Sequence, residues 1–230
     1  MTARDIWAVV PVKRLAHAKM RLSGVLSPAE RVRLAEAMLC DVLGALASVR
    51  LSGALVVTAD PDVAAIARGR GAAVLAEAHE DGINAAVKLG LAHLERKKSS
   101  GVIVLPADVP LVSRHGIERV LAALDEAPLV LVPAHWDGGT NLIAARPPGL
   151  LLPEFGGSSF ARHLRTARAR GIEARVLHLD GIGRDIDRPG DLAEHAGAGV
   201  TTLTADFLRS LDRANRLAPA RRPAVVPHHA

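Results

Sequence analysis

Short runs of hydrophobic residues alternate along the chain with longer segments in which hydrophobic positions recur every three or four residues. The short runs predict buried strands, and the longer segments predict amphipathic helices. We expect strands at 6–11, 54–58, 72–75, 102–105, 129–133, 141–145 and 174–178. We expect helices at 27–48, 60–71, 83–97, 113–124, 158–170 and 188–195.

Strands that alternate with helices predict an α/β fold. Most strand runs are continuously hydrophobic, which is typical of a mostly parallel sheet with both faces covered. We therefore expect a single Rossmann-like domain of three layers over residues 1–199. The run at 141–145 follows a turn at 135–139, and we expect it to pair back on the preceding strand.

The end of the chain differs from this body in charge. The sequence has a net charge of +5, and five arginines against two aspartates follow residue 200. Three prolines, Pro219, Pro223 and Pro227, lie in the same stretch. We interpret residues 200–230 as a helix followed by a basic, disordered tail that aids solubility. The alternative is an arm that binds nucleic acid or a membrane.

Composition excludes several classes of protein. Aromatic residues make up 2% of the 230 residues, too few for platforms that stack single-stranded nucleic acid. A single cysteine excludes a disulfide framework and a cysteine-built zinc site. No hydrophobic run approaches the ~20 residues of a membrane span, and no leader precedes the first strand. We expect a cytoplasmic protein with no nucleic-acid or membrane partner.

Charged residues gather where the predicted strands end. Basic residues follow the first strand, and carboxylates follow the fourth and the last: Lys13, Lys19, Arg21, Asp108, Asp185 and Asp187. In open α/β folds, ligands bind beyond the carboxyl ends of the strands. Carboxylates can hold a hard cation there, while basic side chains neutralise phosphate oxygens. The combination is typical of a site for a metal-bound polyphosphate.

Each of these residues also has a structural interpretation. Asp108 could cap the helix that begins near residue 113, and Asp185 or Asp187 could cap the helix that begins at Pro189. We expect one of these last two to be a cap and favour Asp187 as the metal ligand. The basic loop could be a solvated surface.

Two smaller motifs leave similar alternatives. Gly156-Gly157-Ser158-Ser159 precedes a helix, so it could bind a second anion or only cap the helix. Thr140 and Asn141 follow a Gly-Gly turn and could belong to the turn or contact a ligand. Cys40 is expected in the core, and the scattered histidines are expected to be packed or solvated. Neither G-x-G-x-x-G after the first strand nor G-x-x-x-x-G-K-[ST] occurs, which disfavours dinucleotide dehydrogenases and P-loop NTPases.

Six segments, taken in order, resemble the CofC/FbiD family of guanylyltransferases. The first is VVPVKRLAHAKMRL at residues 9–22. The others are GINAA at 82–86, PADVPL at 106–111, DGGTN at 137–141, FGGSS at 155–159 and DIDRPGDL at 185–192. The last is also similar to the closing motif of the wider MobA-like nucleotidyltransferases. The resemblance covers residues 6–196.

This resemblance implies a fold of the nucleotide-diphospho-sugar transferase type and an activity in coenzyme F-420 biosynthesis. Such enzymes transfer GMP from GTP to 2-phospho-L-lactate, phosphoenolpyruvate or 3-phospho-D-glycerate and release pyrophosphate. The family also implies a homodimer as a possible assembly. Many relatives have Gly-Pro-Gly-Ser where this chain has Gly156-Gly157-Ser158-Ser159, so the register of that loop is open by one residue.

The resemblance also implies roles for single residues. Asp108 and Asp187 would hold Mg²⁺, with the choice between Asp185 and Asp187 left open, and Lys13 would contact phosphates. The acid substrate would be bound by Thr140, Asn141, Gly156 and Ser159.

The residues support such a reaction without the family. A phosphate monoester has a second pKa of about 6 and is already a nucleophilic anion, so it needs no histidine base. Positioning and charge neutralisation remain, and we assign them to Lys13, Lys19, Arg21 and Asp108 as catalytic residues. With so few aromatics, guanine would be bound by hydrogen bonds, and the predicted nucleotide-binding residues are Asp81, Gly82, Asn84 and Pro106.

Two alternatives stay open. A molybdopterin or sugar-phosphate nucleotidyltransferase has the same fold but normally a glycine-rich first loop, which this chain lacks until Gly24. A non-catalytic protein that binds a nucleotide or nucleic acid is the second alternative.

Overall fold

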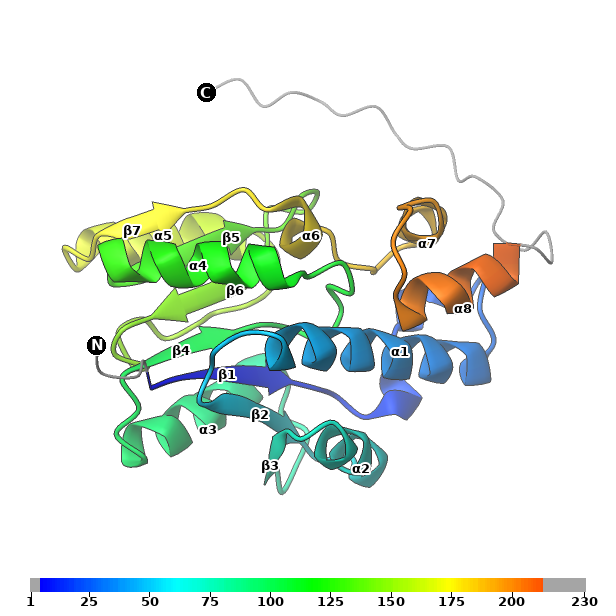
Figure 1. Cartoon of the computed structure of the whole chain (residues 1–230), viewed down its shortest axis with the longest axis horizontal. Coiled ribbons are helices and arrows are strands. Elements are labelled where there is room, and N and C mark those ends of the chain that lie inside the picture. The colour runs from blue at the N-terminus through cyan, green and yellow to red at the C-terminus, as the bar shows by residue number, and fades with distance from the viewer. Residues whose placement is uncertain (1–4, 213–230) are drawn as a thin grey trace.

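Seven strands form one sheet at the centre of the molecule (Figure 1). The computed structural model describes residues 5–212. The strands are β1 (Ile6–Pro11), β2 (Gly53–Thr58), β3 (Ala73–Ala76), β4 (Gly101–Val104), β5 (Leu129–Pro133), β6 (Thr140–Ala145) and β7 (Ala174–Val176). Their order is β3-β2-β1-β4-β6-β5-β7, and of these strands only β6 runs antiparallel to its neighbours. The mostly parallel sheet and the pairing of β6 with β5 are confirmed.

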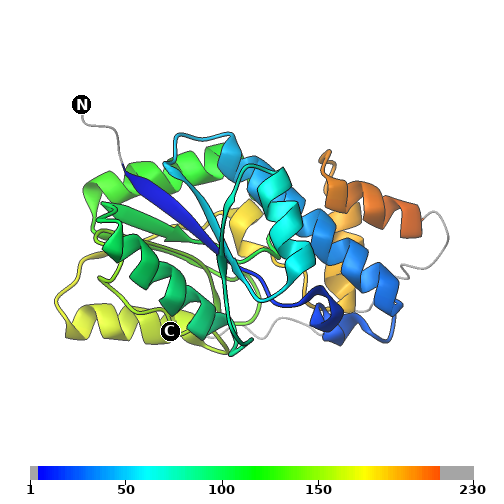
Figure 2. The same cartoon turned by 90° about the horizontal axis from the view of Figure 1, so that it is seen from below.

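Helices cover both faces of this sheet (Figure 2). They are α1 (Pro28–Ala47), α2 (Pro61–Gly69), α3 (Ile83–Arg96), α4 (Arg114–Glu126), α5 (Ser159–Ala169), α6 (Asp180–Gly183), α7 (Pro189–Ala196) and α8 (Leu203–Asp212), with 3-10 turns η1 (Leu15–His17) and η2 (Met20–Leu22). Side chains of α1, α2 and α4 share one hydrophobic core with the sheet, and those of α3 and α5 share another. The predicted three-layer α/β architecture is confirmed.

Local sequence signals fix where the helices begin. The Ser27 hydroxyl accepts a hydrogen bond from the Glu30 amide, and the Glu30 carboxylate accepts one from the Ser27 amide at 2.8 Å. This capping box satisfies amides that the first turn of a helix leaves unpaired. At α2, Asp60 is the cap, because its carboxylate accepts from the amides of Asp62 and Val63.

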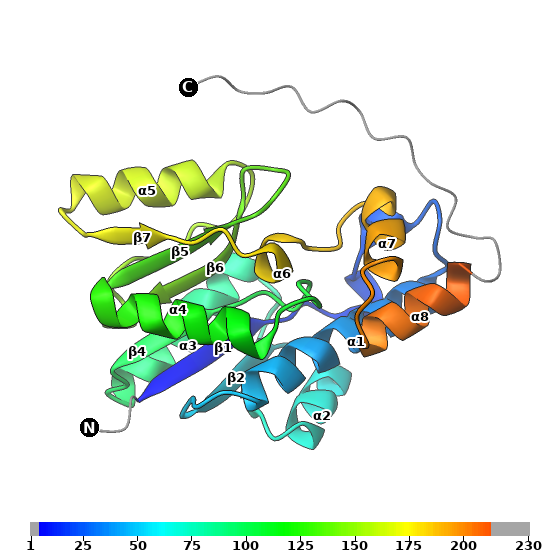
Figure 3. The ribbon, with the colours of Figure 1, turned by 45° about the horizontal axis from the view of Figure 1, so that its top comes forward.

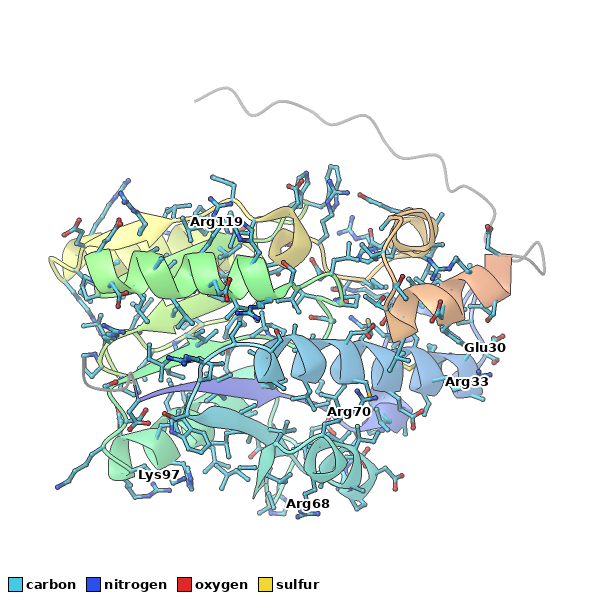
Figure 4. The ribbon with its side chains drawn as sticks, viewed as in Figure 1. Glu30, Arg33, Arg68, Arg70, Lys97 and Arg119 are labelled. Carbon is cyan, nitrogen blue, oxygen red and sulfur yellow. The ribbon has the colours of Figure 1, made fainter. Side chains whose placement is uncertain are left out.

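A third hydrophobic cluster lies beyond the sheet, between the first half of α1 and the helices α7 and α8 (Figure 3). It contains Leu22, Leu34, Ile186 and Leu208, each at most 3% exposed, among others. At its rim, the guanidinium of Arg33 on α1 lies 5.2 Å from the centre of the Phe207 ring on α8 (Figure 4). The predicted helix after residue 200 thus exists and packs against α1 and α7.

Three features differ from or lie beyond the sequence predictions. The short helix α6 was not predicted, since four residues do not establish a helical period. Cys40 is only partly buried, contrary to the expected core position, because it points away from the buried face formed by Met38 and Leu39.

The tail predicted to be disordered lies outside the described residues from 213 on, and the domain boundary at 199 stays a prediction. No helix within residues 5–212 has the length and hydrophobicity to cross a bilayer.

Truncation of Leu208 tests whether α8 is part of the folded body. This side chain is fully buried in the third cluster, so we expect Leu208→Ala to lower the free energy of unfolding by about 2–4 kcal/mol in urea titrations. Leu203 on the same helix is 45% exposed, and Leu203→Ala serves as the control with a loss of at most about 1 kcal/mol. Equal effects of the two variants would contradict the packing of α8.

Candidate active site

Four segments far apart in the sequence meet at one edge of the sheet. Asp108 follows β4, and Lys19 and Arg21 lie in the loop after β1. Because β6 runs antiparallel to β4, its first residues, Thr140 and Asn141, lie at this same edge. The segment between α6 and α7 completes the group. The edge is the one at which parallel α/β sheets bind their ligands.

A backbone hydrogen bond joins the two segments that carry the predicted metal ligands. The Ile186 amide donates to the Asp108 carbonyl at 3.0 Å. Since Ile186 is fully buried in the third cluster, Asp185 and Asp187 are held on either side of an anchored residue. One carboxylate oxygen from each of Asp108, Asp185 and Asp187 lies within 4.8 Å of the other two. We refer to these three residues as the acidic triad.

Two basic side chains neutralise the acidic triad. The Lys19 ammonium donates to Oδ2 of Asp108 at 2.8 Å and to Oδ1 of Asp187 at 2.9 Å. Arg21 donates to the other oxygen of Asp187 at 3.0 Å. The Lys19 side chain is 9% exposed and that of Arg21 is 70% exposed. Lys19 is therefore enclosed between two carboxylates, whereas Arg21 approaches one carboxylate from solvent.

The loop after β1 is fixed at both ends, and this positions Lys19. Before it, the buried Leu15 amide donates to Oδ2 of Asp60 at 2.8 Å. After it, Leu22 is fully buried in the third cluster. Lys19 itself has a left-handed backbone conformation, with φ of 50° and ψ of 41°. Such a conformation costs a lysine energy, so the fixed loop ends hold it in place.

Burial and charge shift the pKa of two groups here. Burial raises the pKa of Asp185 to about 6, and the neighbouring Asp108 carboxylate adds to that shift. For Lys19, burial lowers the pKa, but the Asp108 and Asp187 carboxylates outweigh it and raise the pKa to about 12. The ammonium is thus charged at neutral pH. Perturbed values of this kind are typical of functional sites.

A cleft of about 510 Å³ lies beside the triad, over the ends of β1 and β3. The predicted residues that line it are Lys13, Lys19, Arg21, Gly82, Pro106, Asp108 and Asp187. Leu15, Met38 and Ile83 add an apolar wall, and Glu77 and Glu80, which follow β3 in the chain, also line the cleft. One cavity thus combines basic side chains, two carboxylates of the triad and apolar surface.

Two predicted nucleotide-binding residues are not among those that line the cleft. Asp81 is exposed, and the Asn84 amide group accepts from the Phe155 amide at 2.8 Å and donates to the Phe155 carbonyl at 3.2 Å. Asn84 therefore ties the start of α3 to the loop before α5. Gly82 lines the cleft with a φ of 91°, a conformation that favours glycine.

The predicted acid-binding residues form a second group next to the triad. The Thr140 hydroxyl lies 2.9 Å from Nδ1 of His163 and accepts from the Ser159 hydroxyl at 3.3 Å. Nε2 of His163 accepts from the Glu154 amide at 2.8 Å, so the ring proton lies on Nδ1 and points at Thr140. These side chains connect the start of β6 to the loop that contains Gly156.

Asn141 connects this second group to the triad. Its side-chain amide donates to the Ile182 carbonyl at 3.0 Å and to Oδ1 of Asp185 at 3.1 Å. The predicted acid-binding residues and the predicted metal ligands therefore share a direct contact through Asp185. This contact also gives Asp185 a role that the sequence left open.

None of the three carboxylates of the triad caps the helix that the sequence suggested for it. Ser113, not Asp108, caps α4, because its hydroxyl accepts from the Gly116 amide at 3.1 Å. The expectation that Asp185 or Asp187 caps α7 is wrong. Asp191, inside the helix, instead accepts from the amides of Asp187 and Arg188. All three carboxylates of the triad are thus left for other roles.

Sequence reasoning missed two residues. Glu80 accepts a hydrogen bond from the Arg14 amide at 3.2 Å and so braces the first loop across the cleft. His163, expected to be packed or solvated, is 2% exposed and organises Thr140 and Ser159. The sequence held one signal for this role of His163. It lies four residues after Ser159 in a predicted helix, a spacing that places both side chains on the same helix face.

The chain matches relatives over most of its length. The family model described as "Guanylyl transferase CofC like" matches residues 6–224. The chain belongs to this family. A phosphoenolpyruvate guanylyltransferase from Sphaerobacter thermophilus is 40% identical over 200 residues, which cover 86% of this chain and 96% of the relative. A 3-phospho-D-glycerate guanylyltransferase from Phenylobacterium zucineum is 38% identical over 209 residues, covering 89% and 95%.

Another relative is named for a third substrate, and a solved structure shares the fold. A 2-phospho-L-lactate guanylyltransferase from Methanothermobacter thermautotrophicus is 37% identical over 204 residues, covering 89% of this chain and 90% of the relative. A solved structure from Desulfovibrio desulfuricans G20, described as a nucleotide-diphospho-sugar transferase, has a TM-score of 0.76 at 18% identity and covers 94% of this chain and 99% of its own. The resemblance to CofC enzymes and the predicted fold type are confirmed.

Because His163 is enclosed, we expect the free energy of unfolding to depend on pH. Burial, followed by the nearby Arg162 charge, lowers the pKa of His163 to about 4. In the unfolded chain the pKa of this histidine is about 6.5. As the pH falls, the unfolded state is therefore protonated at this residue before the folded state is. Stability from the neutral ring is complete above pH 6.5 and is lost as the pH falls toward 4.

His163→Gln should accordingly reduce the pH dependence of unfolding. We compare the free energy of unfolding at pH 7 and pH 4 in urea titrations. On acidification it should fall by roughly 1–2 kcal/mol more in the wild type than in His163→Gln. The exposed His115 provides the control variant His115→Gln, which should keep the wild-type slope. A wild-type slope in His163→Gln would show that His163 is not a buried neutral ring.

Proposed function

We propose that this chain transfers GMP from GTP to the phosphate of a small phosphorylated three-carbon acid and releases pyrophosphate. The observation that carries the proposal is the acidic triad with Lys19 and Arg21 at the rim of a cleft that also exposes Lys13. A triphosphate needs such a combination of cation-binding carboxylates and free basic groups. The relatives named for phosphoenolpyruvate, 3-phospho-D-glycerate and 2-phospho-L-lactate support this class of acid. The proposed place in coenzyme F-420 biosynthesis rests on the resemblance of the sequence motifs alone.

The donor set of the triad fits Mg²⁺. All three candidate ligands are carboxylate oxygens, which a small hard cation prefers, and they lie within 4.8 Å of one another. Asp108 and Asp187 would hold the ion and Asp185 would complete its ligand set. When bound, the ion supplies positive charge that neutralises and orients the phosphates. The acid substrate brings the nucleophile, so no protein base has to be added.

The reaction requires one bond to form and one to break. An oxygen of the acid's phosphate attacks the α-phosphorus of GTP, the bond from this phosphorus to the bridging oxygen of the β-phosphate breaks, and pyrophosphate leaves with the electron pair. Lys13 and Arg21 are placed to bind the phosphate oxygens, because both line the cleft. Their charges counter the negative charge that builds up on the leaving group.

The second group of residues supplies a place for the acid next to the triad. Thr140 contacts His163 and accepts from the Ser159 hydroxyl, and the Ser159 amide donates to the Gly156 carbonyl. Asn141, the neighbour of Thr140 in the chain, donates to Asp185. An acid bound there would lie beside the triad, as in-line attack requires. Asp81, Gly82, Asn84 and Pro106 remain the proposed nucleotide-binding residues, of which Gly82 and Pro106 line the cleft.

Pyrophosphate release tests the proposed reaction. We expect the protein with GTP and Mg²⁺ to release pyrophosphate only when one of the three acids is added, and ATP to be a poor substitute. Each acid is assayed separately, and a sugar phosphate and molybdopterin are included as rival acceptors. Turnover with a rival acceptor and none of the acids would overturn the proposal.

Asp108→Asn tests the role of the triad in that reaction. Loss of one negative ligand should lower kcat by about a thousandfold or more, while the fold is retained. Glu118→Gln changes an exposed carboxylate that pairs with Arg114 on α4, away from the cleft, and should leave kcat within about twofold. Turnover of Asp108→Asn equal to that of the control would exclude Asp108 from the machinery.

A further inference from the structure

Lys19 occupies the position that a cation bound to the triad would need. Its ammonium is bonded to one oxygen of Asp108 at 2.8 Å and one of Asp187 at 2.9 Å. Metal–carboxylate bonds of Mg²⁺ are shorter still, at about 2.0–2.1 Å. An ion held by the same two carboxylates would therefore lie directly against a positive charge. The ammonium and the ion exclude each other at this place.

The ammonium is also held there firmly. It lies at the end of a side chain that is 9% exposed, and both of its contacts are hydrogen bonds between charged groups, which are the strong kind. Its backbone is fixed by the buried Leu15 and Leu22 on either side. By contrast, Arg21 is bonded to one carboxylate of the triad, that of Asp187, and is 70% exposed, so it can remain while an ion binds.

A displaced ammonium needs a new negatively charged partner in the cleft. Lys19 lines the cleft together with Lys13 and Arg21, so its long, flexible stem can turn the charge toward that cavity without unfolding the loop. Two further carboxylates, Glu77 and Glu80, line the cleft, and Glu80 is already bonded to the Arg14 amide. Each of them carries a single negative charge, whereas a triphosphate carries several. A bound triphosphate would supply the missing negative charge. Metal ion and nucleotide would then each assist the binding of the other.

We propose that Lys19 is an internal counter-ion that blocks the metal site until a metal–nucleotide complex enters, and that its ammonium then passes from the carboxylates to the triphosphate. This rests on the proposed function for the identity of the nucleotide. The block itself is a property of Lys19 and the triad. It makes the protein bind a free divalent ion weakly and the ion with a nucleoside triphosphate tightly.

Binding of Mn²⁺ in the absence of nucleotide, followed by electron paramagnetic resonance, tests the block directly. We expect Lys19→Met to bind Mn²⁺ at least tenfold more tightly than the wild type. Arg21→Met removes one positive charge beside the same carboxylate and is the matched control, with a gain of less than threefold. Lys19→Arg can bridge both carboxylates and should keep the weak binding of the wild type.

The coupling to nucleotide provides the second readout. A GTP analogue that cannot be cleaved should tighten Mn²⁺ binding at least tenfold in the wild type. In Lys19→Met, where the phosphates can still contact the ion but no ammonium has to be displaced, this factor should be at least threefold smaller. The proposal is overturned if Lys19→Met binds Mn²⁺ no more tightly than Arg21→Met, or if its coupling equals that of the wild type. These measurements need no acid substrate and no turnover, so they can succeed where the guanylyl-transfer assay fails.

A measurement on the unchanged protein covers the case in which Lys19→Met does not fold. The ¹⁵N resonance of the Lys19 ammonium, assigned with Lys19→Arg, should stay in place when millimolar Mg²⁺ is added alone. It should move when the same Mg²⁺ is added with the GTP analogue. A shift with Mg²⁺ alone that equals the shift with both would show that the nucleotide is not needed to release the lysine.

Discussion

The hydrogen bond from the Ile186 amide to the Asp108 carbonyl is the contact on which the site depends. It joins the loop after β4 to a segment almost 80 positions later in the sequence. Ile186 is anchored by the third cluster, which also contains Leu22 from the first loop and Leu208 from α8. One small hydrophobic core outside the sheet thus positions both sides of the acidic triad and the loop that carries Lys19.

Electrostatics explains how the three carboxylates of the triad can lie close together in the folded protein and still attract a divalent ion. Three carboxylates placed so close together repel one another, and the pKa of Asp185 is raised to about 6 by burial and by its neighbours. Lys19 and Arg21 offset this repulsion from one side, and Asn141 donates to Asp185 from the other. The same negative charge that has to be offset in the folded protein attracts a divalent ion. The acidic triad therefore keeps in the folded protein the negative charge that a divalent ion needs for binding.

Most of the fold and the residues of the triad could be predicted from the sequence, for physical reasons that differ. The capping box at Ser27 and the hydrophobic runs are local signals, so the positions of α1 and the strands follow from neighbouring residues. The convergence of Lys19, Asp108 and Asp187 follows from the rule that parallel strands share a carboxyl edge. Neither inference needs any knowledge of side-chain packing.

What could not be predicted depends on the direction in which a side chain points. Asn84 lies in a motif that suggests ligand contact, yet it is bonded to the backbone of Phe155. Cys40 is next to two buried residues, yet one helical step turns it toward the surface. His163 acquires its role only because α5 packs beside the start of β6. The partners of Asn84 and His163 are tertiary contacts, which spacing along the sequence does not identify.

A crystal structure of the protein with Mn²⁺ and a GTP analogue that cannot be cleaved would show whether the triad binds the ion beside the triphosphate, because manganese is located by its anomalous scattering. We expect an anomalous peak in contact with the carboxylates of Asp108 and Asp187 and with the α-phosphate, and the Lys19 ammonium turned from these carboxylates to the triphosphate. A peak remote from both aspartates, or a triphosphate outside the cleft that Lys13 lines, would contradict this expectation.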